Sequence, residues 1–306
     1  MYKDSVKKIL NNYSFQSPAI RSKLFRILNT GKLSGTGKMI ISAVDQGFEH
    51  GADRSFLMNS SGYNPEYHYN FAIKNGLNAL AGSVGFLETA TANCPGMLPL
   101  ILKINSSNSL MHKDCSPTQA ITASVDDAIR LGCDAIGMTI YPGSSQFLNM
   151  VTDLAEIIRE AKSKGLAVII WSYARGEGIS DPMAVDVISY GAQMACQLGA
   201  DIVKVKIPNA TVEKPEPKKL YAEYGIKFDT ISDRIKIVVN SCFSGKRMVI
   251  FSGGEAKNDE QMIDDVSGIV GGGGNGSIVG RNIFQRKEVD AQKLVTDMIN
   301  DYSRLV

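Results

Sequence analysis

The sequence lacks the paired cysteines of a disulfide framework or of a cysteine-rich zinc site. Its five cysteines are odd in number, and no two of them form a C-x-x-C pair. No apolar stretch approaches the length of a membrane span, and the first fifteen residues, MYKDSVKKILNNYSF, contain no apolar signal-peptide core. We therefore expect a protein of the reducing cytoplasm that does not enter a membrane.

An excess of charge of either sign is also missing. The chain has 33 basic and 31 acidic side chains, a net charge of +2, which provides no basic field for nucleic acid or an anionic membrane. The three histidines are not spaced as metal ligands. We expect a surface or structural role for His68 and His112, whereas His50 lies close to a predicted strand end and its role stays open.

Eight short apolar runs recur along the 306 residues, and helical patterns separate many of them. The runs are KMIISAVD (38–45), LNALAGSVG (77–85), LPLILKIN (98–105), CDAIGMTIY (133–141), LAVIIWSY (166–173), ADIVKVKI (200–207), RMVIFSGG (247–254) and NGSIVGRN (275–282). They are continuous rather than alternating, as is typical of parallel strands covered on both faces. The pattern predicts an α/β protein with a (β/α)8 barrel, and a doubly wound open sheet is the alternative.

We expect residues 1–306 to form a single barrel domain, with residues 1–37 as a mostly helical amino-terminal extension. The polar segment PNATVEKPEPKKLYAEYGIKF (208–228) is predicted to be a long insertion after the sixth strand. Two glycine-rich stretches, GKLSGTGKM (31–39) and GGGGNG (271–276), precede strands instead of following them. They are therefore predicted to be loops rather than nucleotide-binding motifs.

Two lysines, Lys204 and Lys206, lie in the sixth apolar run. Alternate residues of a strand share a face, so both side chains are predicted to point the same way. Desolvation and a neighbouring like charge both lower the pKa of a lysine, and a neutral lysine attacks ketones to form a Schiff base. The alternative is that both lysines pair with carboxylates or extend out of the strand end.

Active sites of such barrels lie at the carboxyl ends of the strands, where further candidates occur. Tyr173 is a candidate acid–base residue, with a pKa that a nearby lysine ammonium would lower. Asp45 can bind a substrate hydroxyl or carry a proton. Trp171 is expected to shape a pocket wall, and Arg175 is a candidate substrate-binding residue, as is Lys206.

Small residues follow the seventh and eighth runs, in SGG (252–254) and GRN (280–282). They let backbone N–H groups approach an anion, and a following helix favours negative charge at its amino terminus. The predicted phosphate-binding residues are Ser252, Gly253, Gly254, Gly280 and Arg281. The alternative is that these glycines only turn the chain.

Six motifs occur in order between about Ile40 and Gln285: SAVDQGFEHG, TIYPGS, IIWSYARG, ADIVKVK, FSGG and IVGRN. Together they resemble the archaeal-type class I fructose-bisphosphate aldolases, which also occur in bacteria. The resemblance implies a barrel in a homo-oligomer, often a decamer. It also implies metal-independent cleavage of a phosphorylated sugar, fructose 1,6-bisphosphate, to dihydroxyacetone phosphate and glyceraldehyde 3-phosphate, and we expect no cofactor.

The resemblance also implies residue roles. The Schiff-base lysine of the family falls on Lys204, its acid–base tyrosine on Tyr173 and its aspartate on Asp45. The phosphate-binding loops fall on Ser252, Gly253, Gly254, Gly280 and Arg281. The chain departs from many archaeal members at Gln46, where they have histidine, at Ala174, where they have proline, and in its longer insertion after the sixth strand.

Other functions stay open at this point. Related Schiff-base enzymes include synthases that build an aminodideoxyheptulosonate precursor and thiolases that act on a phosphorylated pentane-dione. A phosphosugar isomerase barrel would need no covalent adduct. An inactive phosphate-binding scaffold is a further alternative, which any trapping of an imine would exclude.

Overall fold

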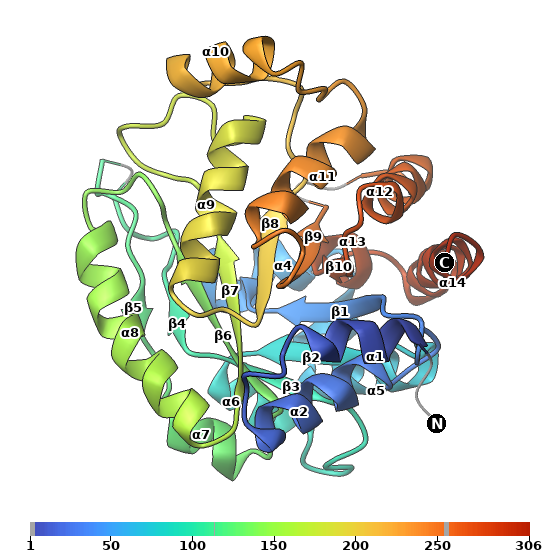
Figure 1. The fold of residues 1–306 in the computed structure, drawn as a ribbon. Helices are drawn as coiled ribbons and strands as arrows, with labels where there is room; N and C mark the ends of the chain where they lie inside the picture. The colour runs from blue at the N-terminus through green and yellow to red at the C-terminus, as the bar shows by residue number, and fades with distance from the viewer. Residues whose placement is uncertain (1–3, 113, 254–256) are drawn as a thin grey trace.

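The computed structural model describes residues 4–112, 114–253 and 257–306. Its centre is a closed barrel of parallel strands in the order β1-β10-β9-β8-β7-β6-β3-β2, surrounded by helices (Figure 1). The strands are β1 (Met39–Val44), β2 (Ala79–Gly82), β3 (Leu100–Lys103), β6 (Ala135–Ile140), β7 (Ala167–Ser172), β8 (Ile202–Lys206), β9 (Met248–Ser252) and β10 (Gly276–Val279). Each strand lies inside one predicted apolar run. The predicted (β/α)8 barrel is confirmed, and the open-sheet alternative is wrong.

Two helices precede the first strand, and the others follow strands, most of them packed against the outside of the barrel. They are α1 (Asp4–Asn11), α2 (Pro18–Leu28), α3 (Gln46–His50), α4 (Ala52–Phe56), η1 (Ser60–Tyr63), α5 (Pro65–Asn75), α6 (Val84–Ala90), α7 (Val125–Arg130), α8 (Phe147–Ser163), α9 (Val185–Gln197), α10 (Pro215–Glu223), α11 (Ile231–Ser241), α12 (Asp259–Gly271), α13 (Arg281–Phe284) and α14 (Glu288–Arg304). A small antiparallel pair, β4 (Asn105–Ser106) and β5 (Ala120–Ile121), was not predicted.

Local sequence signals explain several of these helices. α7, α11 and α12 each begin with a capping box, in which Ser124, Thr230 and Asn258 pair with the residue three positions further on. α8 buries Met150, Leu154, Ile158 and Ala161, at the spacing that places side chains on one helix face. Such helices cover the outward-facing side chains of the strands.

Alternation along the strands divides the core into two layers. In β7, Val168 and Ile170 belong to the apolar layer between barrel and helices, whereas Ile169 and Trp171 belong to the barrel interior. The large indole of Trp171 fits because the neighbouring strand β6 has glycine at position 137, two residues before Thr139, which is paired with Trp171. A Cβ on Gly137 would lie only 1.8 Å from the Trp171 ring. The barrel interior is therefore packed: the indole of Trp171 on β7 occupies the space that the missing side chain of Gly137 on β6 leaves.

The predicted amino-terminal arm contains α1 and α2, and its apolar side chains join the cluster of the barrel interior. Tyr13, between the two helices, is fully buried. Its hydroxyl donates to the carbonyl of Asp201, 2.6 Å away, and accepts from the N–H of Met248 at 2.8 Å. Asp201 directly precedes β8, and Met248 begins β9. The arm thus closes the amino-terminal end of the barrel.

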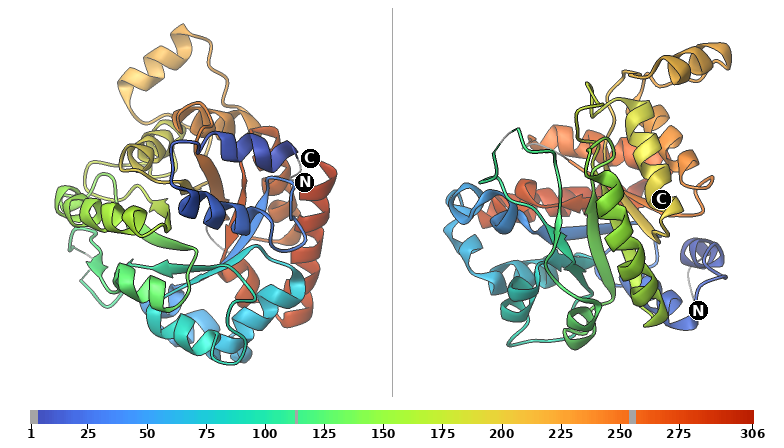
Figure 2. Two further views of the ribbon diagram at one scale, coloured as in Figure 1. Left: turned by 60° about the horizontal axis from the view of Figure 1, so that its bottom comes forward. Right: turned by 90° about the vertical axis from the view of Figure 1, so that its left-hand side faces the viewer.

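The predicted insertion after β8 contains α10, which has no buried residue. The helix stands away from the barrel in both views of Figure 2. Within the described parts of the chain, no helix is long and apolar enough to cross a lipid bilayer. The five cysteines are unpaired thiols, as expected from their number and spacing.

Replacing Tyr13 by phenylalanine should destabilise the fold. The change removes the hydroxyl that satisfies a buried N–H and a buried carbonyl, which costs about 1–3 kcal/mol. Urea unfolding measures the effect. Tyr190→Phe is the matched control, because that side chain is exposed on α9, and it should leave the free energy of unfolding nearly unchanged. Equal stability of the two variants would contradict this account of the arm.

Candidate active site

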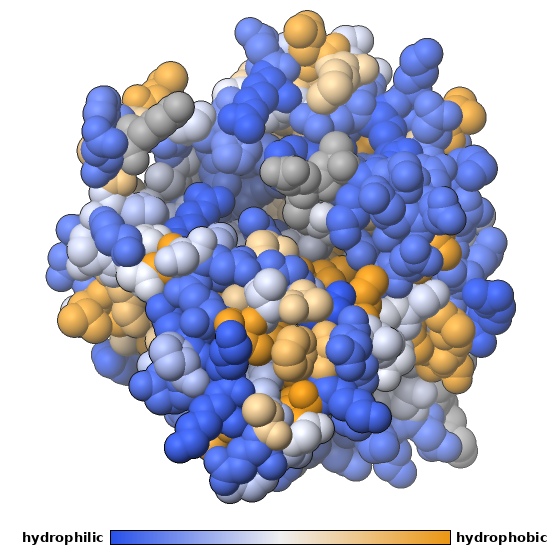
Figure 3. Space-filling model, turned by 90° about the horizontal axis from the view of Figure 1, so that it is seen from above, coloured by the Kyte–Doolittle hydropathy of each residue, from blue (hydrophilic) through white to orange (hydrophobic). Residues whose placement is uncertain are grey.

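A cavity lies at the carboxyl ends of the strands, opposite the arm. Its walls come from β1 and α3, β7, β8, β9, and β10 with α13. The residues that line it are Ala43, Asp45, Gln46, Glu49, His50, Tyr173, Arg175, Lys204, Lys206, Ser252, Gly253, Ile278, Val279, Gly280, Arg281 and Asn282. In Figure 3 a largely hydrophilic hollow is visible above and to the left of the centre of the view. Most of the predicted site residues meet in this cavity.

Lys204 points into the barrel because its neighbours on β8 point outward. Val203 and Val205 belong to the layer beneath the helices, and Ile202 belongs to the interior. Lys204 is only 5% exposed, and its Nζ lies 5.1 Å from the centre of the Trp171 ring. Burial is the main cause that lowers the pKa of Lys204, to about 8. A substantial fraction of this amine is therefore neutral near physiological pH.

A second buried lysine, Lys103 at the end of β3, was missed by the sequence analysis. It is 1% exposed, and its Nζ lies 3.3 Å from Glu49 Oε1 and 3.6 Å from Asp45 Oδ2. Burial by itself lowers the pKa of Lys103, but Asp45 and Glu49 outweigh burial and raise it. Lys103 therefore stays a cation. Its signal in the sequence was a charged residue at the end of the apolar run LPLILKIN.

Lys103 is a like charge beside Lys204 that the sequence analysis did not consider. After burial, its ammonium lowers the pKa of Lys204, whereas Asp45 and Glu49 act in the opposite direction. That Lys206 is a further neighbouring charge stays a prediction. Lys206 is half-buried and lines the same cavity as Lys204, so the predicted common face of the two lysines is confirmed.

Asp45 follows β1 and precedes α3, and it is 9% exposed. Burial alone would raise the pKa of this carboxyl. The ammonium groups of Lys103 and Lys204, with hydrogen bonds, reverse the effect and leave the pKa below its ordinary value. Asp45 is therefore a carboxylate at neutral pH, and it faces the cavity together with Lys204.

Tyr173 lies beside Lys204, with the lysine Nζ 5.4 Å from the centre of its ring. The prediction that a nearby ammonium lowers the pKa of Tyr173 is wrong in its net direction. Burial raises the pKa well above that of a free phenol, and a hydrogen bond with Ser252 and the charge of Lys103 offset this only in part. Tyr173 is thus a protonated phenol at rest, which can donate a proton but not accept one.

Of the two predicted pocket residues Trp171 and Arg175, only Arg175 lines the cavity. Trp171 is 1% exposed and does not line the cavity, but lies beneath it, within 6 Å of both buried lysines, at 5.1 Å from Lys204 and 5.8 Å from Lys103. The expectation that it forms a wall is therefore corrected. Arg175 lines the cavity, with its guanidinium 4.9 Å from the ring of Tyr141.

The two predicted phosphate loops border the same cavity through Ser252, Gly253, Gly280 and Arg281. Gly254 lies outside the described residues. Gly280 is required sterically, because a Cβ there would lie 2.8 Å from the carbonyl oxygen of Ala43 and 2.7 Å from Nε2 of Gln46. A side chain at this position would push the loop away from β1 and widen the cavity.

The histidines have separate locations. His50 lines the cavity from α3, and burial is the main cause that lowers its pKa. His68 is buried among aromatic rings and bonds to the carbonyl of Gly62 at 2.8 Å, whereas His112 is exposed. The structural and surface roles expected for His68 and His112 are confirmed. His50 and Gln46 are cavity residues to which the sequence analysis gave no role.

A closed parallel barrel with a cavity of ionisable side chains at its strand ends defines a (β/α)8-barrel enzyme. Residues 39–286 match the DeoC/LacD family of aldolases. The chain therefore belongs to this family.

Individual relatives agree with this assignment. A class 1 fructose-bisphosphate aldolase of Thermoproteus tenax is 34% identical, over 82% of this chain and 85% of its own length. A probable class 1 enzyme of Chlamydia trachomatis is 30% identical, over 97% and 88%. An archaeal fructose-1,6-bisphosphate aldolase was solved with its catalytic lysine bound to a carbinolamine intermediate. It has a TM-score of 0.75 and 31% identity, covering 94% of this chain and 99% of that one. The resemblance seen in the sequence is confirmed.

Removing the ammonium of Lys103 should make Lys204 harder to deprotonate. Lys103→Met leaves Asp45 and Glu49 uncompensated beside Lys204 and removes a like charge, and both changes raise the pKa of Lys204. The pH dependence of covalent labelling at Lys204, followed by peptide mass spectrometry, should therefore shift from a midpoint near pH 8 to higher pH.

Lys206→Met is the matched comparison, since it removes a lysine from the same cavity and the same strand. Its labelling midpoint should shift less than that of Lys103→Met, because Lys103 is the like charge that lowers the pKa of Lys204 after burial. A larger alkaline shift in this variant than in Lys103→Met would contradict the assignment of Lys103 as the neighbouring charge.

Proposed function

We propose that this chain is a class I, Schiff-base-forming fructose-bisphosphate aldolase. It cleaves fructose 1,6-bisphosphate to dihydroxyacetone phosphate and glyceraldehyde 3-phosphate, in the pathways that break down and build hexoses. The observation that carries the proposal is Lys204, a buried lysine with a pKa of about 8 that lines the cavity of a barrel of this aldolase family. The names of the relatives support the choice of substrate.

The first half of the reaction forms the Schiff base. Neutral Lys204 attacks C2 of the open-chain ketone and gives a carbinolamine. The phenol of Tyr173 donates its proton to the C2 hydroxyl, which leaves as water. The products are a protonated imine on Lys204 and a phenolate on Tyr173. The adjacent positive imine stabilises the phenolate, which would otherwise be costly in this buried place.

Bond cleavage then uses that phenolate as a base. It accepts the proton of the C4 hydroxyl while the C3–C4 bond breaks, and the electron pair of this bond moves into the imine to form an enamine. Glyceraldehyde 3-phosphate leaves, and Tyr173 is again a phenol. The phenol of Tyr173 donates its proton to C3 of the enamine, which restores the protonated imine. Water then adds to C2 and gives a proton back to the phenolate of Tyr173, and collapse of the carbinolamine releases dihydroxyacetone phosphate and neutral Lys204.

Charged and polar groups around Lys204 orient the substrate in this proposal. Asp45 is a carboxylate that accepts hydrogen bonds from sugar hydroxyls and assists the carbinolamine steps. Ser252, Gly253, Gly280 and Arg281 bind one phosphate, and we extend this site to Gly254 from the family resemblance. Lys206 and Arg175 supply further positive charge in the cavity. Binding of the phosphates holds the bond that reacts next to the lysine.

Borohydride reduction in the presence of dihydroxyacetone phosphate should attach the substrate irreversibly to Lys204, as found by peptide mass spectrometry. Lys204→Met should form no adduct and lose cleavage while remaining folded. Tyr173→Phe keeps the amine, so it should still form the adduct, although more slowly because it lacks the proton donor for loss of water, and it should turn over about 10²–10⁴-fold more slowly. An adduct on another residue, or turnover by Lys204→Met, would refute the mechanism.

The same assays separate the alternatives. A Schiff-base synthase or thiolase would form the adduct but fail to cleave fructose 1,6-bisphosphate in a coupled assay. A phosphosugar isomerase would turn over its substrate without a trapped adduct, and an inactive scaffold would do neither.

We also propose that the enzyme is a cytoplasmic homo-oligomer, with a decamer as the expected size. The family resemblance and five free cysteines support these assignments. Leu220, Tyr224 and Ile226, in and after the projecting helix α10, are exposed apolar side chains available for contact with another copy. Light scattering coupled to gel filtration should give a mass well above the 33.1 kDa of one chain. A monomeric mass at micromolar concentration would contradict this proposal.

A further inference from the structure

The two loops that carry the proposed phosphate site are not joined by the barrel itself. Pairing between β9 and β10 extends only as far as Phe251 and Ser277. Ser252, Gly253, Gly280 and Arg281 all lie beyond these last paired positions. Direct pairing of β9 with β10 therefore does not fix the spacing between the loops, and contacts outside the sheet can do so.

Asn282, the second residue of α13, makes such a contact. Its side-chain oxygen accepts a hydrogen bond from the backbone N–H of Lys257, at 2.8 Å. Its amide nitrogen lies 3.1 Å from the position of a Cβ on Gly253. Asn282 is 5% exposed, and it contacts the loop after β9 at Gly253 and at Lys257. One side chain of the β10 loop thus contacts two positions of the β9 loop.

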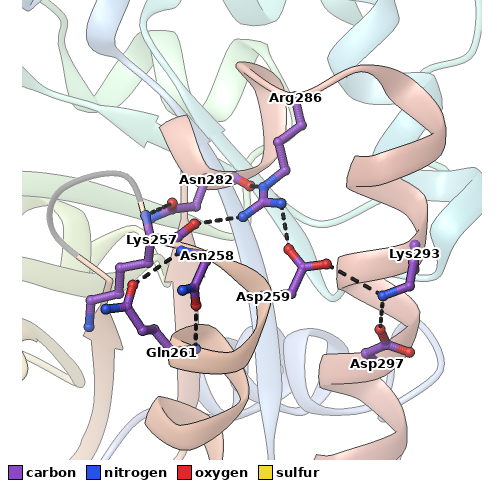
Figure 4. A network of polar contacts seen from close by, with 8 residues as sticks. All are labelled: Lys257, Asn258, Asp259, Gln261, Asn282, Arg286, Lys293 and Asp297. Carbon is purple, nitrogen blue, oxygen red and sulfur yellow. Dashed lines mark hydrogen bonds and ion pairs between the residues drawn. The ribbon is translucent and has the colours of Figure 1, made fainter.

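Arg286 holds this arrangement from the other side (Figure 4). Its Nε donates to the carbonyl of Asn282 at 2.8 Å, and one terminal nitrogen donates to the carbonyl of Lys257 at 2.7 Å. The other terminal nitrogen pairs with Asp259, the first residue of α12, at 2.5 Å. The planar guanidinium therefore binds both loops and the start of α12 in one rigid geometry.

Neighbouring ion pairs fix the ends of this network. Lys257 Nζ lies 2.6 Å from Asp265 on α12, and Asp259 also contacts Lys293 on α14 at 3.4 Å. Arg286 does not line the cavity, so it cannot contribute directly to the binding of a ligand there. Its three contacts instead determine how the groups that do line the cavity are placed.

We infer that Arg286, acting through Asn282 and Lys257, is a positioning residue that sets the spacing of the β9 and β10 loops for binding the phosphate of the substrate. This inference rests on the proposed function for the identity of the substrate. The network places the phosphate-binding groups before substrate arrives, so that less binding energy is lost in ordering them.

The test compares Arg286→Ala with Lys293→Ala. Both variants remove a cation that contacts Asp259, but the side chain of Lys293 is 65% exposed and its ion pairs are with Asp259 and Asp297. Calorimetry with inorganic phosphate, and the KM and kcat for fructose 1,6-bisphosphate, are measured for each. Trapping of unphosphorylated dihydroxyacetone by borohydride reports on the amine chemistry alone.

For Arg286→Ala we expect phosphate affinity to fall, and KM to rise, by about tenfold, the effect of losing one charge-assisted hydrogen bond. The rate of trapping dihydroxyacetone should stay at the wild-type value, and Lys293→Ala should resemble the wild type throughout. Unchanged phosphate affinity in Arg286→Ala would overturn the inference. So would an equal loss with the unphosphorylated ketone, because that indicates general disruption of the barrel.

Arg286→Lys covers the case in which the alanine variant does not fold. A lysine can pair with Asp259 but cannot reach all three acceptors, so the same loss of phosphate affinity is expected, and wild-type affinity would overturn the inference. Phosphate binding is measured without turnover. If the wild type binds phosphate in a manner that depends on Arg286 but does not cleave the sugar bisphosphate, the inference stands and the proposed function fails.

Discussion

The ion pairs of Lys103 with Asp45 and Glu49 are the interaction on which the carboxyl end of this barrel depends. Two lysines and a carboxylate are almost fully buried there, and a second carboxylate lies at the edge. An isolated charge in such a place would neutralise itself. Burial lowers the pKa of Lys204 against the opposing attraction of Asp45, and the ammonium of Lys103 adds to the lowering. The same cluster keeps Asp45 ionised. One arrangement thus produces an amine that is ready to react and a carboxylate that is ready to bind hydroxyls.

Packing beneath the cavity maintains that arrangement. Trp171 fills the barrel interior under both lysines, and it does so only because Gly137 leaves room for the indole. On the other side, Gly280 lets the β10 loop approach β1 closely. Residues that form and break no bonds therefore set the positions of the reactive groups. They are Trp171 beneath the lysines, Gly280 in the loop beside β1, and Arg286 with its hydrogen-bonded partners.

Much of the fold followed from the sequence, because continuous apolar runs and helical periodicity are local properties. Each barrel strand lies within a predicted run, and Lys204 was identified from its place in one of them. What could not be predicted depends on which distant segments meet. β3 ends in Lys103, but the carboxylates that pair with this lysine, Asp45 and Glu49, lie about fifty residues earlier in the chain. The effect of Lys103 on the site could therefore be seen only in the structure. The pKa of Tyr173 was misjudged for the same reason: its burial, which outweighs the nearby cations, comes from the closed barrel around it.

The buried hydroxyl of Tyr13 has a consequence for how the chain reaches this structure. Its two partners lie 188 and 235 residues further along the sequence. Tyr13 is synthesised before β8 and β9, so its hydroxyl lacks both of these partners until the two strands exist. Closure of the barrel also joins β1 to β10, near opposite ends of the chain. Contacts of such long sequence separation form late and make folding slow. The contacts of Tyr13 therefore form only after most of the chain has been synthesised, and apolar surface that is still uncovered in that period exposes the chain to aggregation.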